Sequence, residues 1–286
     1  MKYFERVKVH FISPNRSFHS DGEMECARFR VELRIDPIET KDYTAEIAIE
    51  ILKEMDKKFK EYYTSSENNN ITIHVTPLLD EQGRAIYPRV PVKCSFCKVE
   101  KPKEVRAIKL PKRVWFEVAY PKGLFNLKPV EGNINYGGTE VHFEILEIRK
   151  VEVELEPSEA YSILFRGPAL LPDPYSKDDE PLNLRFLPLP SILFFRNAFE
   201  LGLDRDMAMY LLNRTFVEDH SSLHSLGKVW YFYKGRWLPG LSGSMLMRVR
   251  GEVNEKVLKI INYASCSGVG IKRELGFGDV LIGPSK

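Results

Sequence analysis

Apolar and polar residues alternate along the first half of the chain in a pattern that predicts a sheet packed against a helix. The residues Phe29, Val31, Leu33 and Ile35 alternate with charged residues, which is the period of a half-buried strand. In the following segment, Lys41–Tyr63, apolar residues recur at spacings of three and four, as on one face of a helix. Further strands are expected at residues 3–13, 71–76, 90–94, 114–120 and 140–156, with a loop at 132–138.

The second half repeats this order of elements. Strands are expected at residues 161–166, 229–233, 244–250 and 279–282, and helices at 192–201, 207–212 and 253–265. The boundary is placed near Pro157, so the predicted domains are residues 1–156 and 157–286. Each half follows the order strand–helix–strand–strand–helix–strand, although the second helix of the first half is weakly marked. The predicted fold class is therefore α+β, with two tandem ferredoxin-like domains.

Composition and charge bound the function only loosely. The chain has 286 residues, of which 43% are hydrophobic and 29% charged, as in a globular protein of about two domains. Its 42 basic and 40 acidic residues leave a net charge of +2, so a nucleic-acid site would need basic residues concentrated locally. No apolar run is long enough to span a membrane, and the amino terminus lacks a signal-peptide pattern. Four cysteines do not make a disulfide scaffold, so a reducing cytoplasm is the expected location.

The most specific motif is the glycine-rich segment 268–278, between the last predicted helix and the last predicted strand. Glycines permit positive φ and close backbone approach, and consecutive N–H groups in such a loop can bind an anion. Lys272 and Arg273 lie at its centre and add charge for phosphate contacts. The alternative is a helix cap at Gly268 followed by an ordinary hairpin. The segment is neither a Walker motif nor a dinucleotide-binding fingerprint, which excludes those two nucleotide-binding classes.

This glycine pattern resembles the signature of the repeat-associated mysterious protein (RAMP) superfamily. Within it, the sequence is similar to the CRISPR RNA-processing endoribonucleases of the Cas-six family. Three further stretches, 165–171, 187–190 and 237–243, resemble that family's elements in order and spacing. About 120 residues carry the resemblance well, whereas the first half agrees mainly in element order, with residues 1–24 as an extension.

The resemblance implies an enzyme that binds CRISPR repeat RNA and cuts it without a metal ion or cofactor. The ribose 2′-hydroxyl attacks the neighbouring phosphate, leaving a 2′,3′-cyclic phosphate and a 5′-hydroxyl. Such a step needs a proton acceptor, a cation beside the phosphorane and a proton for the leaving oxygen. The alternative is a RAMP-type subunit that holds the guide RNA in a CRISPR effector complex without cutting it. The implied partners are CRISPR repeat RNA and, as open possibilities, effector-complex subunits and a second copy of the chain.

The sequence departs from the family at the histidine that many members carry in or just after the first helix. No histidine lies between His19 and His74. The first predicted helix instead carries Lys53, Lys57 and Lys60 at helical spacing on one face. Such lysines resemble a variant of the family in which ammonium groups stabilise the phosphorane, so Lys57 and Lys60 are the catalytic candidates. Tyr43 fits another family position, and His19 is a candidate if the extension folds over the site. The alternatives are a packing role for Tyr43 and a solvated helix face on which the lysines pair with Glu50, Glu54 and Asp56.

RNA contacts are expected from basic residues beside aromatic rings and from the glycine-rich loop. The predicted RNA-binding residues are Lys234 and Arg236 at a hairpin tip, Arg28 and Arg30 on one face of the early strand, and Gly268, Gly270, Lys272, Arg273, Gly276 and Gly278. The pair Cys94 and Cys97 is half of a tetrahedral zinc site, but the sequence has no second C-x-x-C, so no metal site is predicted.

Overall fold

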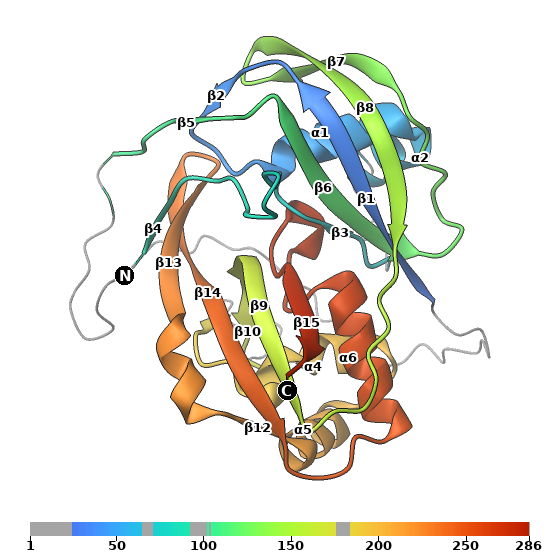
Figure 1. The fold of residues 1–286 in the computed structure, drawn as a ribbon, viewed down its shortest axis with the longest axis vertical. Helices are drawn as coiled ribbons and strands as arrows, with labels where there is room; N and C mark the ends of the chain where they lie inside the picture. The colour runs from blue at the N-terminus through green and yellow to red at the C-terminus, as the bar shows by residue number, and fades with distance from the viewer. Residues whose placement is uncertain (1–24, 65–70, 92–101, 103, 176–183, 286) are drawn as a thin grey trace.

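A computed structural model of the chain describes residues 25–64, 71–91, 102, 104–175 and 184–285. These residues form two sheet-and-helix units, one above the other in Figure 1, joined by the segment between β8 and β9. Pro157 lies in this connection. The strand expected at residues 3–13, the candidate His19 and the cysteines Cys94 and Cys97 lie outside the described residues.

The first unit is built on an antiparallel sheet with the order β3-β6-β1-β8-β7. Apart from β7, this is the strand order of a ferredoxin-like fold. The expected second helix is not seen among the described residues between β6 and β8, where the chain forms β7 instead. The loop predicted at 132–138 is therefore wrong over most of its length. The strands are β1 (Cys26–Ile35), β3 (His74–Val75), β6 (Arg113–Pro121), β7 (Glu131–Tyr136) and β8 (Thr139–Val151).

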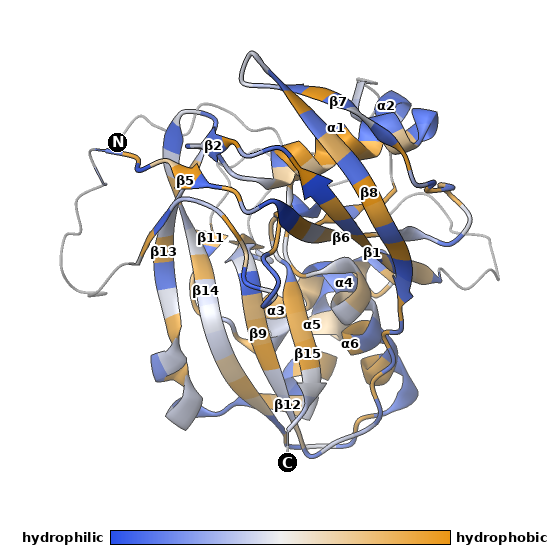
Figure 2. Cartoon of the chain, turned by 45° about the horizontal axis from the view of Figure 1, so that its top comes forward, coloured by the Kyte–Doolittle hydropathy of each residue, from blue (hydrophilic) through white to orange (hydrophobic). Residues whose placement is uncertain are grey.

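Two helices cover one face of this sheet in place of the one expected. They are α1 (Ala45–Met55) and α2 (Lys57–Thr64), separated by Asp56 in an extended conformation. The Asp56 carboxylate accepts hydrogen bonds from the backbone N–H groups of Lys58 and Asn126, both at 2.8 Å, which is a capping role that aspartate favours. The predicted apolar stripe is confirmed at Leu52 and Phe59, which are fully buried with the inward residues of β1. Figure 2 shows the alternation of hydrophilic and hydrophobic residues along β8.

The second unit repeats the arrangement with its helices in place. Its sheet has the order β15-β9-β14-β13-β4, and helices α3 to α6 supply the core against its inner face. Each strand predicted in this half is present, and β9 and β14 are longer than expected. The helices are present too, but the one predicted over 192–201 is divided at Phe194 into α3 and α4. The strands are β9 (Ala160–Ala169), β12 (Phe216–Glu218), β13 (Leu226–Tyr233), β14 (Arg236–Val249) and β15 (Val280–Pro284). The helices are α3 (Pro190–Leu193), α4 (Phe195–Glu200), α5 (Arg205–Thr215) and α6 (Glu255–Ser267).

The edge of the second sheet is completed by a strand from the first half of the sequence. This strand, β4 (Arg89–Pro91), pairs with β13 across Val229, Trp230 and Tyr231. The two halves are therefore interlocked by backbone hydrogen bonds as well as by side chains. Two short pairs, β2 (Glu39–Thr40) with β5 (Ile108–Lys109) and β10 (Leu171–Pro172) with β11 (Leu184–Arg185), and the 3-10 turns η1 (His220–Ser225) and η2 (Arg273–Leu275) complete the described elements.

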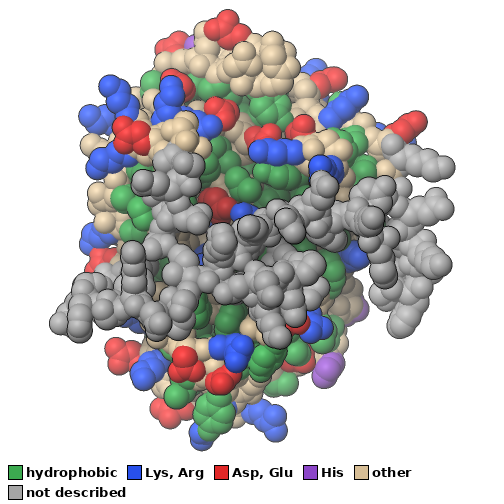
Figure 3. Space-filling model, turned by 180° about the vertical axis from the view of Figure 1, so that it is seen from behind, with side chains coloured by type: hydrophobic (Ala, Val, Ile, Leu, Met, Phe, Trp, Pro, Cys, Tyr) green, Lys and Arg blue, Asp and Glu red, His purple; other side chains and the backbone are tan. Residues whose placement is uncertain are grey.

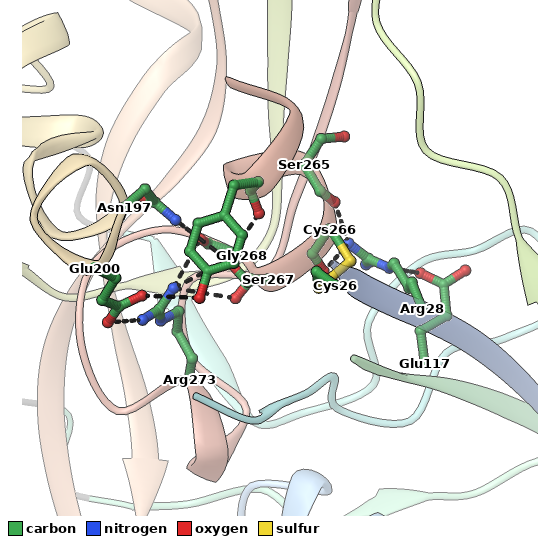
Figure 4. The surroundings of a disulfide bond; sticks show 11 residues. Cys26, Arg28, Glu117, Asn197, Glu200, Ser265, Cys266, Ser267, Gly268 and Arg273 are labelled. Atoms are coloured by element: carbon green, nitrogen blue, oxygen red, sulfur yellow. Dashed lines mark hydrogen bonds and ion pairs between the residues drawn. A yellow bond between two sulfur atoms is a disulfide. The ribbon is translucent and has the colours of Figure 1, made fainter. Parts of the chain in front are cut away.

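A disulfide joins the two units, which the cysteine count did not predict. Cys26 at the start of β1 is bonded to Cys266 in the last turn of α6, 240 residues further along the chain. Figure 4 shows the bond beside the Arg28 side chain, which reaches from β1 to the carbonyl group of Ser265. No helix within the described ranges combines the length and apolarity that crossing a bilayer requires.

Replacing both cysteines, as in Cys26→Ser with Cys266→Ser, is expected to lower the free energy of unfolding by about 2–5 kcal/mol. The reason is that the bond closes a loop of 240 residues and so restricts the unfolded chain. Denaturant unfolding without reductant measures the difference, and reductant should bring the wild-type protein to the same midpoint. A Cys94→Ser, Cys97→Ser variant serves as the control and should keep its response to reductant. If reductant lowered the unfolding midpoint of the Cys26→Ser, Cys266→Ser variant as much as that of the wild type, the Cys26–Cys266 disulfide would be contradicted.

Candidate active site

The glycine-rich segment between α6 and β15 is shaped by close backbone contacts. Gly268 ends α6 with φ 75°, which confirms the predicted helix cap. A Cβ atom on Gly278 would lie 1.8 Å from the carbonyl oxygen of Val269, and one on Gly270 would lie 2.3 Å from that of Leu170. Both glycines also have positive φ. A side chain at Gly270 would therefore push the loop away from the end of β9, and one at Gly278 would push apart the two ends of the loop.

The loop does not present its glycines as an open anion-binding nest. All four glycines are buried, and the N–H groups of Val269, Ile271, Gly276 and Gly278 donate to carbonyl oxygens of the protein. Direct RNA contacts by these four glycines remain a prediction, and their burial in this structure does not support it. Two charged side chains of the loop, Lys272 and Glu274, are half-buried and reach solvent in part.

Arg273 points inward, contrary to the expectation of a phosphate contact. Its side chain is 5% exposed and forms an ion pair with Glu200 of α4. It also donates to the hydroxyl group of Ser267 at 3.1 Å, next to the Asn197 amide that donates to the carbonyl oxygen of Gly268 (Figure 4). Burial by itself favours the neutral guanidinium, but Glu200 overcomes this and raises the pKa of Arg273. Arg273 therefore anchors the loop to α4 in this structure.

Arg28 is also buried, in a cluster of charges where the two units meet. Its guanidinium contacts Glu117 of β6 and Asp279 of the second unit, both at 2.7 Å. Arg166 of β9 completes the cluster, at 2.6 Å from Glu117 and 2.8 Å from Asp279. Each side chain is at most 5% exposed. The polar face of β1 is thus covered by the second unit at this end, and Arg28 has a structural role here.

A neutral histidine borders the same cluster. His74 is fully buried, with Nε2 3.4 Å from a carboxylate oxygen of Asp279. Burial lowers the pKa of His74, although the hydrogen bond to Asp279 opposes the shift. Burial also opposes ionisation of Asp279, but Arg166, His74 and Arg28 together hold its pKa well below the usual range. The cluster therefore contains two arginines, two carboxylates and an uncharged imidazole.

Arg30, two residues along the strand, is at the border of the covered region. Its side chain is 34% exposed and pairs with Glu117 at 3.1 Å. Its guanidinium also lies 3.9 Å from the centre of the Trp115 ring. The RNA contact predicted for Arg30 remains a prediction, on a residue that is accessible in part.

Tyr43 is packed rather than accessible. It is fully buried among Tyr87, Tyr231 and Phe277, and its hydroxyl donates to the carbonyl oxygen of Gly276 at 2.7 Å. Burial raises the pKa of Tyr43 well above its ordinary value, so the phenol stays protonated. Tyr43 therefore has the packing role that the sequence analysis gave as an alternative. Its hydrogen bond to Gly276 holds the glycine-rich loop against the start of α1.

Three lysine–glutamate pairs surround the place where α1, the glycine-rich loop and the β13–β14 turn converge. They are Lys234 with Glu46 at 3.5 Å, Lys53 with Glu50 at 2.7 Å and Lys272 with Glu274 at 3.8 Å. Two tyrosines, Tyr63 and Tyr233, lie beside these ion pairs. Tyr63 donates to the carbonyl oxygen of Glu274 at 2.6 Å and lies beneath the Lys53 ammonium. The Lys234 ammonium lies 5.4 Å from the centre of the Tyr233 ring. Burial raises the pKa of Tyr233, Lys234 opposes the shift, and Glu46 and Glu274 add to it. We call this group the three-lysine site.

Two of these lysines have an unusual backbone. Lys234 has φ 47° and Lys272 has φ 60°, and no other described residue except glycine has a positive φ. This conformation costs a non-glycine residue about 1–2 kcal/mol. An exposed ion pair is worth only about 0.2–1 kcal/mol, so the pair with Glu46 does not compensate for the cost at Lys234. The ion pair with Glu46 therefore does not by itself explain the strained backbone at Lys234.

The remaining predicted residues lie around this site or outside it. Lys57 and Lys60 are on the exposed side of α2, and no ion pair of either is seen among the described residues. Their catalytic role stays a prediction. Lys53, on the same predicted face, forms the pair with Glu50 that the alternative interpretation expected. Arg236 is exposed at the start of β14, next to the Lys234 turn. Figure 3 shows basic and acidic side chains interspersed over the described part of one face, which therefore carries no extended basic patch there.

Glu46 and Tyr233 of the site, and Asp279 of the charge cluster, were not singled out from the sequence. The turn Lys234-Gly235 is unusual already in the sequence. A two-residue hairpin turn with positive φ usually has asparagine or glycine at its first position, and this one has lysine. Within the described ranges, no three His, Cys, Asp or Glu side chains are grouped so that they could hold a metal ion. The arrangement supplies cations, carboxylates and phenols, which suit phosphate binding and proton transfer.

The class of fold is thus a pair of ferredoxin-like units with a glycine-rich loop packed between them. The sequence matches no family model and no curated protein. Solved structures do match. One is a Cas6 protein of Thermus thermophilus, with a TM-score of 0.54 and 10% identity over 90% of this chain and 98% of that chain. Another is a Cas6 product complex, with a TM-score of 0.52 and 13% identity over 90% and 98% of the two chains.

A further match is the product of a Cas6-related gene from Pyrococcus furiosus, with a TM-score of 0.50 and 12% identity over 90% and 98% of the chains. Identities this low establish the fold alone. The protein has a Cas6-like fold, and the predicted α+β class with tandem ferredoxin-like units is confirmed.

The substitution Gly278→Ala is expected to destabilise the protein by about 2 kcal/mol or more, because it combines positive φ with an overlap at 1.8 Å. The control is Gly227→Ala, where no atom lies within 4 Å of the added Cβ and φ is not positive. Thermal and denaturant melts measure both variants. Equal stability of the two would contradict the account of the loop.

The substitution Asp279→Asn should lower stability near pH 7 by about 3–5 kcal/mol, because it leaves two buried arginines short of a counter-charge. The folded pKa of Asp279 is lowered, so its contribution is present above the unfolded pKa of about 4 and is lost as the pH falls below that value. The variant should accordingly lose less stability on acidification than the wild type does. Asp206→Asn, at an exposed ion pair, is the control. An unchanged acid limb in Asp279→Asn would show that the cluster is not ionised as described.

Proposed function

We propose that this protein is an endoribonuclease that processes CRISPR repeat RNA, cutting once per repeat without a metal ion. The three-lysine site on a Cas6-like fold is the observation that carries this proposal. The three lysines come from three elements that contact one another, since Lys234 pairs with Glu46 of α1, and Tyr63 contacts both Lys53 and Glu274. Ammonium groups of this kind can contact the phosphates of an RNA strand. One of the matching structures supports a cleavage reaction, since it is described as a product complex of a Cas6 protein.

The reaction would be attack of a ribose 2′-hydroxyl on the adjacent phosphate, giving a 2′,3′-cyclic phosphate and a 5′-hydroxyl. Lysines can stabilise the charge of the phosphorane, because an ammonium group is a compact cation with three donors. The nearby carboxylates and phenols can exchange protons with the reacting oxygens. Assembly with effector-complex subunits, formation of a homodimer and a cytoplasmic location remain parts of this proposal.

The alternative is a subunit that binds the guide RNA without cutting it. The observation in its favour is that the described residues of the three-lysine site include no histidine, the commonest general acid and base. Both functions predict RNA binding that weakens with salt, so binding alone does not separate them.

The separating experiment is incubation with CRISPR repeat RNA in EDTA, with a second RNA that carries a 2′-deoxy substitution at the cut nucleotide. We expect cleavage of the first RNA at one position, with a cyclic phosphate end, and none of the second. The double variant Lys57→Ala, Lys60→Ala tests the lysines chosen from the sequence. It should slow cleavage about 100-fold or more with little change in RNA affinity. Unchanged rates would move catalysis to other residues, and binding without cleavage by the wild type would favour the alternative.

A further inference from the structure

The β13–β14 turn holds a lysine where the backbone favours another residue. The turn is two residues long, with φ 47° at Lys234 and φ 75° at Gly235. Asparagine or glycine suits the first of these positions, because both tolerate the left-handed conformation. The pair with Glu46 is too exposed to account for the lysine through stability. The side chain itself is therefore the feature that needs an explanation.

The side chain of Lys234 meets a carboxylate at the three-lysine site. Its ammonium lies 3.5 Å from Glu46, with side-chain exposures of 65% and 26%. Glu46 is in the first turn of α1, and Lys234 is on a hairpin from the other unit. A proton acceptor and a proton donor from two separate elements thus lie in contact, and both can reach a ligand.

We propose, on the basis of the proposed function, that Glu46 and Lys234 are the acid–base pair of RNA cleavage. Glu46 accepts the proton of the 2′-hydroxyl, and the 2′-oxygen forms a bond to phosphorus. The bond from phosphorus to the 5′-oxygen breaks, and the 5′-oxygen takes a proton from the Lys234 ammonium. When the product has left, the Glu46 carboxylic acid returns its proton to the Lys234 amine across their contact. Every atom and charge is restored without a metal ion or co-reactant.

The surroundings of Glu46 suit the role of a base. Burial raises its pKa, Lys234 opposes the shift, and Asp42 and Glu50 add to it. A carboxylate with a raised pKa takes up a proton more readily than an ordinary one. Burial lowers the pKa of Lys234, but Tyr233 and Glu46 reverse this and raise it, so the donor is charged at neutral pH. The titratable and charged groups that face Glu46 are Lys234 and Tyr233 on the hairpin, Asp42 and Glu50 near or on α1, and Tyr136 on β7.

The other two lysines of the three-lysine site would contact phosphates of the bound RNA. Lys53 and Lys272 each have a glutamate partner that an RNA phosphate would replace. In the free protein these glutamates neutralise the lysines.

The test uses the full chain and single-turnover cleavage of CRISPR repeat RNA across a range of pH. Glu46→Gln should cut 10²–10⁴-fold more slowly than the wild type, while its RNA affinity is unchanged or higher. The wild-type rate should fall as the pH falls through the pKa of Glu46, because only the carboxylate accepts a proton. This acid limb should be absent in Glu46→Gln. The control is Glu54→Gln, an exposed position on the same helix.

At the hairpin, Lys234→Asn removes the ammonium and suits the left-handed backbone, so the fold is kept and thermal melts should show no loss. Its cleavage rate should fall at least 100-fold. Lys234→Arg keeps the positive charge but does not give up a proton, so it should not restore the rate, whereas a role in charge stabilisation alone would allow it to. Cleavage by Glu46→Gln and Lys234→Asn within threefold of the wild type would overturn this inference and leave the proposed function standing. A wild-type protein that binds the repeat RNA and does not cut it would overturn the proposed function, and the acid–base pair with it.

Discussion

Two arginines and two carboxylates, buried where the two units meet, determine how the units are oriented. Arg28 and Glu117 come from the first sheet, and Arg166 and Asp279 come from the second unit. Removing such charges from water is costly, and the cost is met only when each charge keeps its partners at close range. A shift of one unit relative to the other would leave charges buried and unpaired. The cluster therefore allows one relative orientation, and the Cys26 disulfide lies beside it.

This orientation is what brings the candidate site together. Asp279 immediately follows the glycine-rich loop, so the charge cluster holds the loop at one end, and the buried Arg273 holds its middle. Between them, Gly276 lies against the start of α1, where Tyr43 donates to its carbonyl oxygen. The loop, α1 and the hairpin tip contribute one lysine each to the site. None of these elements could form the site without the contact between the units.

Local patterns in the sequence predicted most of the fold. Alternation identified β1, spacing identified the helices, and the element order indicated ferredoxin-like units. The errors have physical causes. The single helix expected over Lys41–Tyr63 is divided because Asp56 caps the helix that follows. The edge strand β7 was taken for a loop because glycine and asparagine are common in it. The contribution of β4 to the second sheet is a pairing over long sequence distance, which no local pattern records.

The predictions about the site were limited in the same way, because local patterns do not record contacts between distant parts of the chain. By itself, the sequence determined which segments are strands and helices and where glycines allow a tight loop, because these depend on residues close together in the chain. It also indicated that charged side chains lie on the polar face of β1 and in the loop. Only the tertiary structure decided which of those charges meet solvent. Arg28 and Arg273 are buried because a partner from a distant part of the chain covers and neutralises each, whereas Lys234 and Lys272 reach the surface of one site. Burial of a charge depends on partners brought by the fold, and sequence spacing carries no record of them.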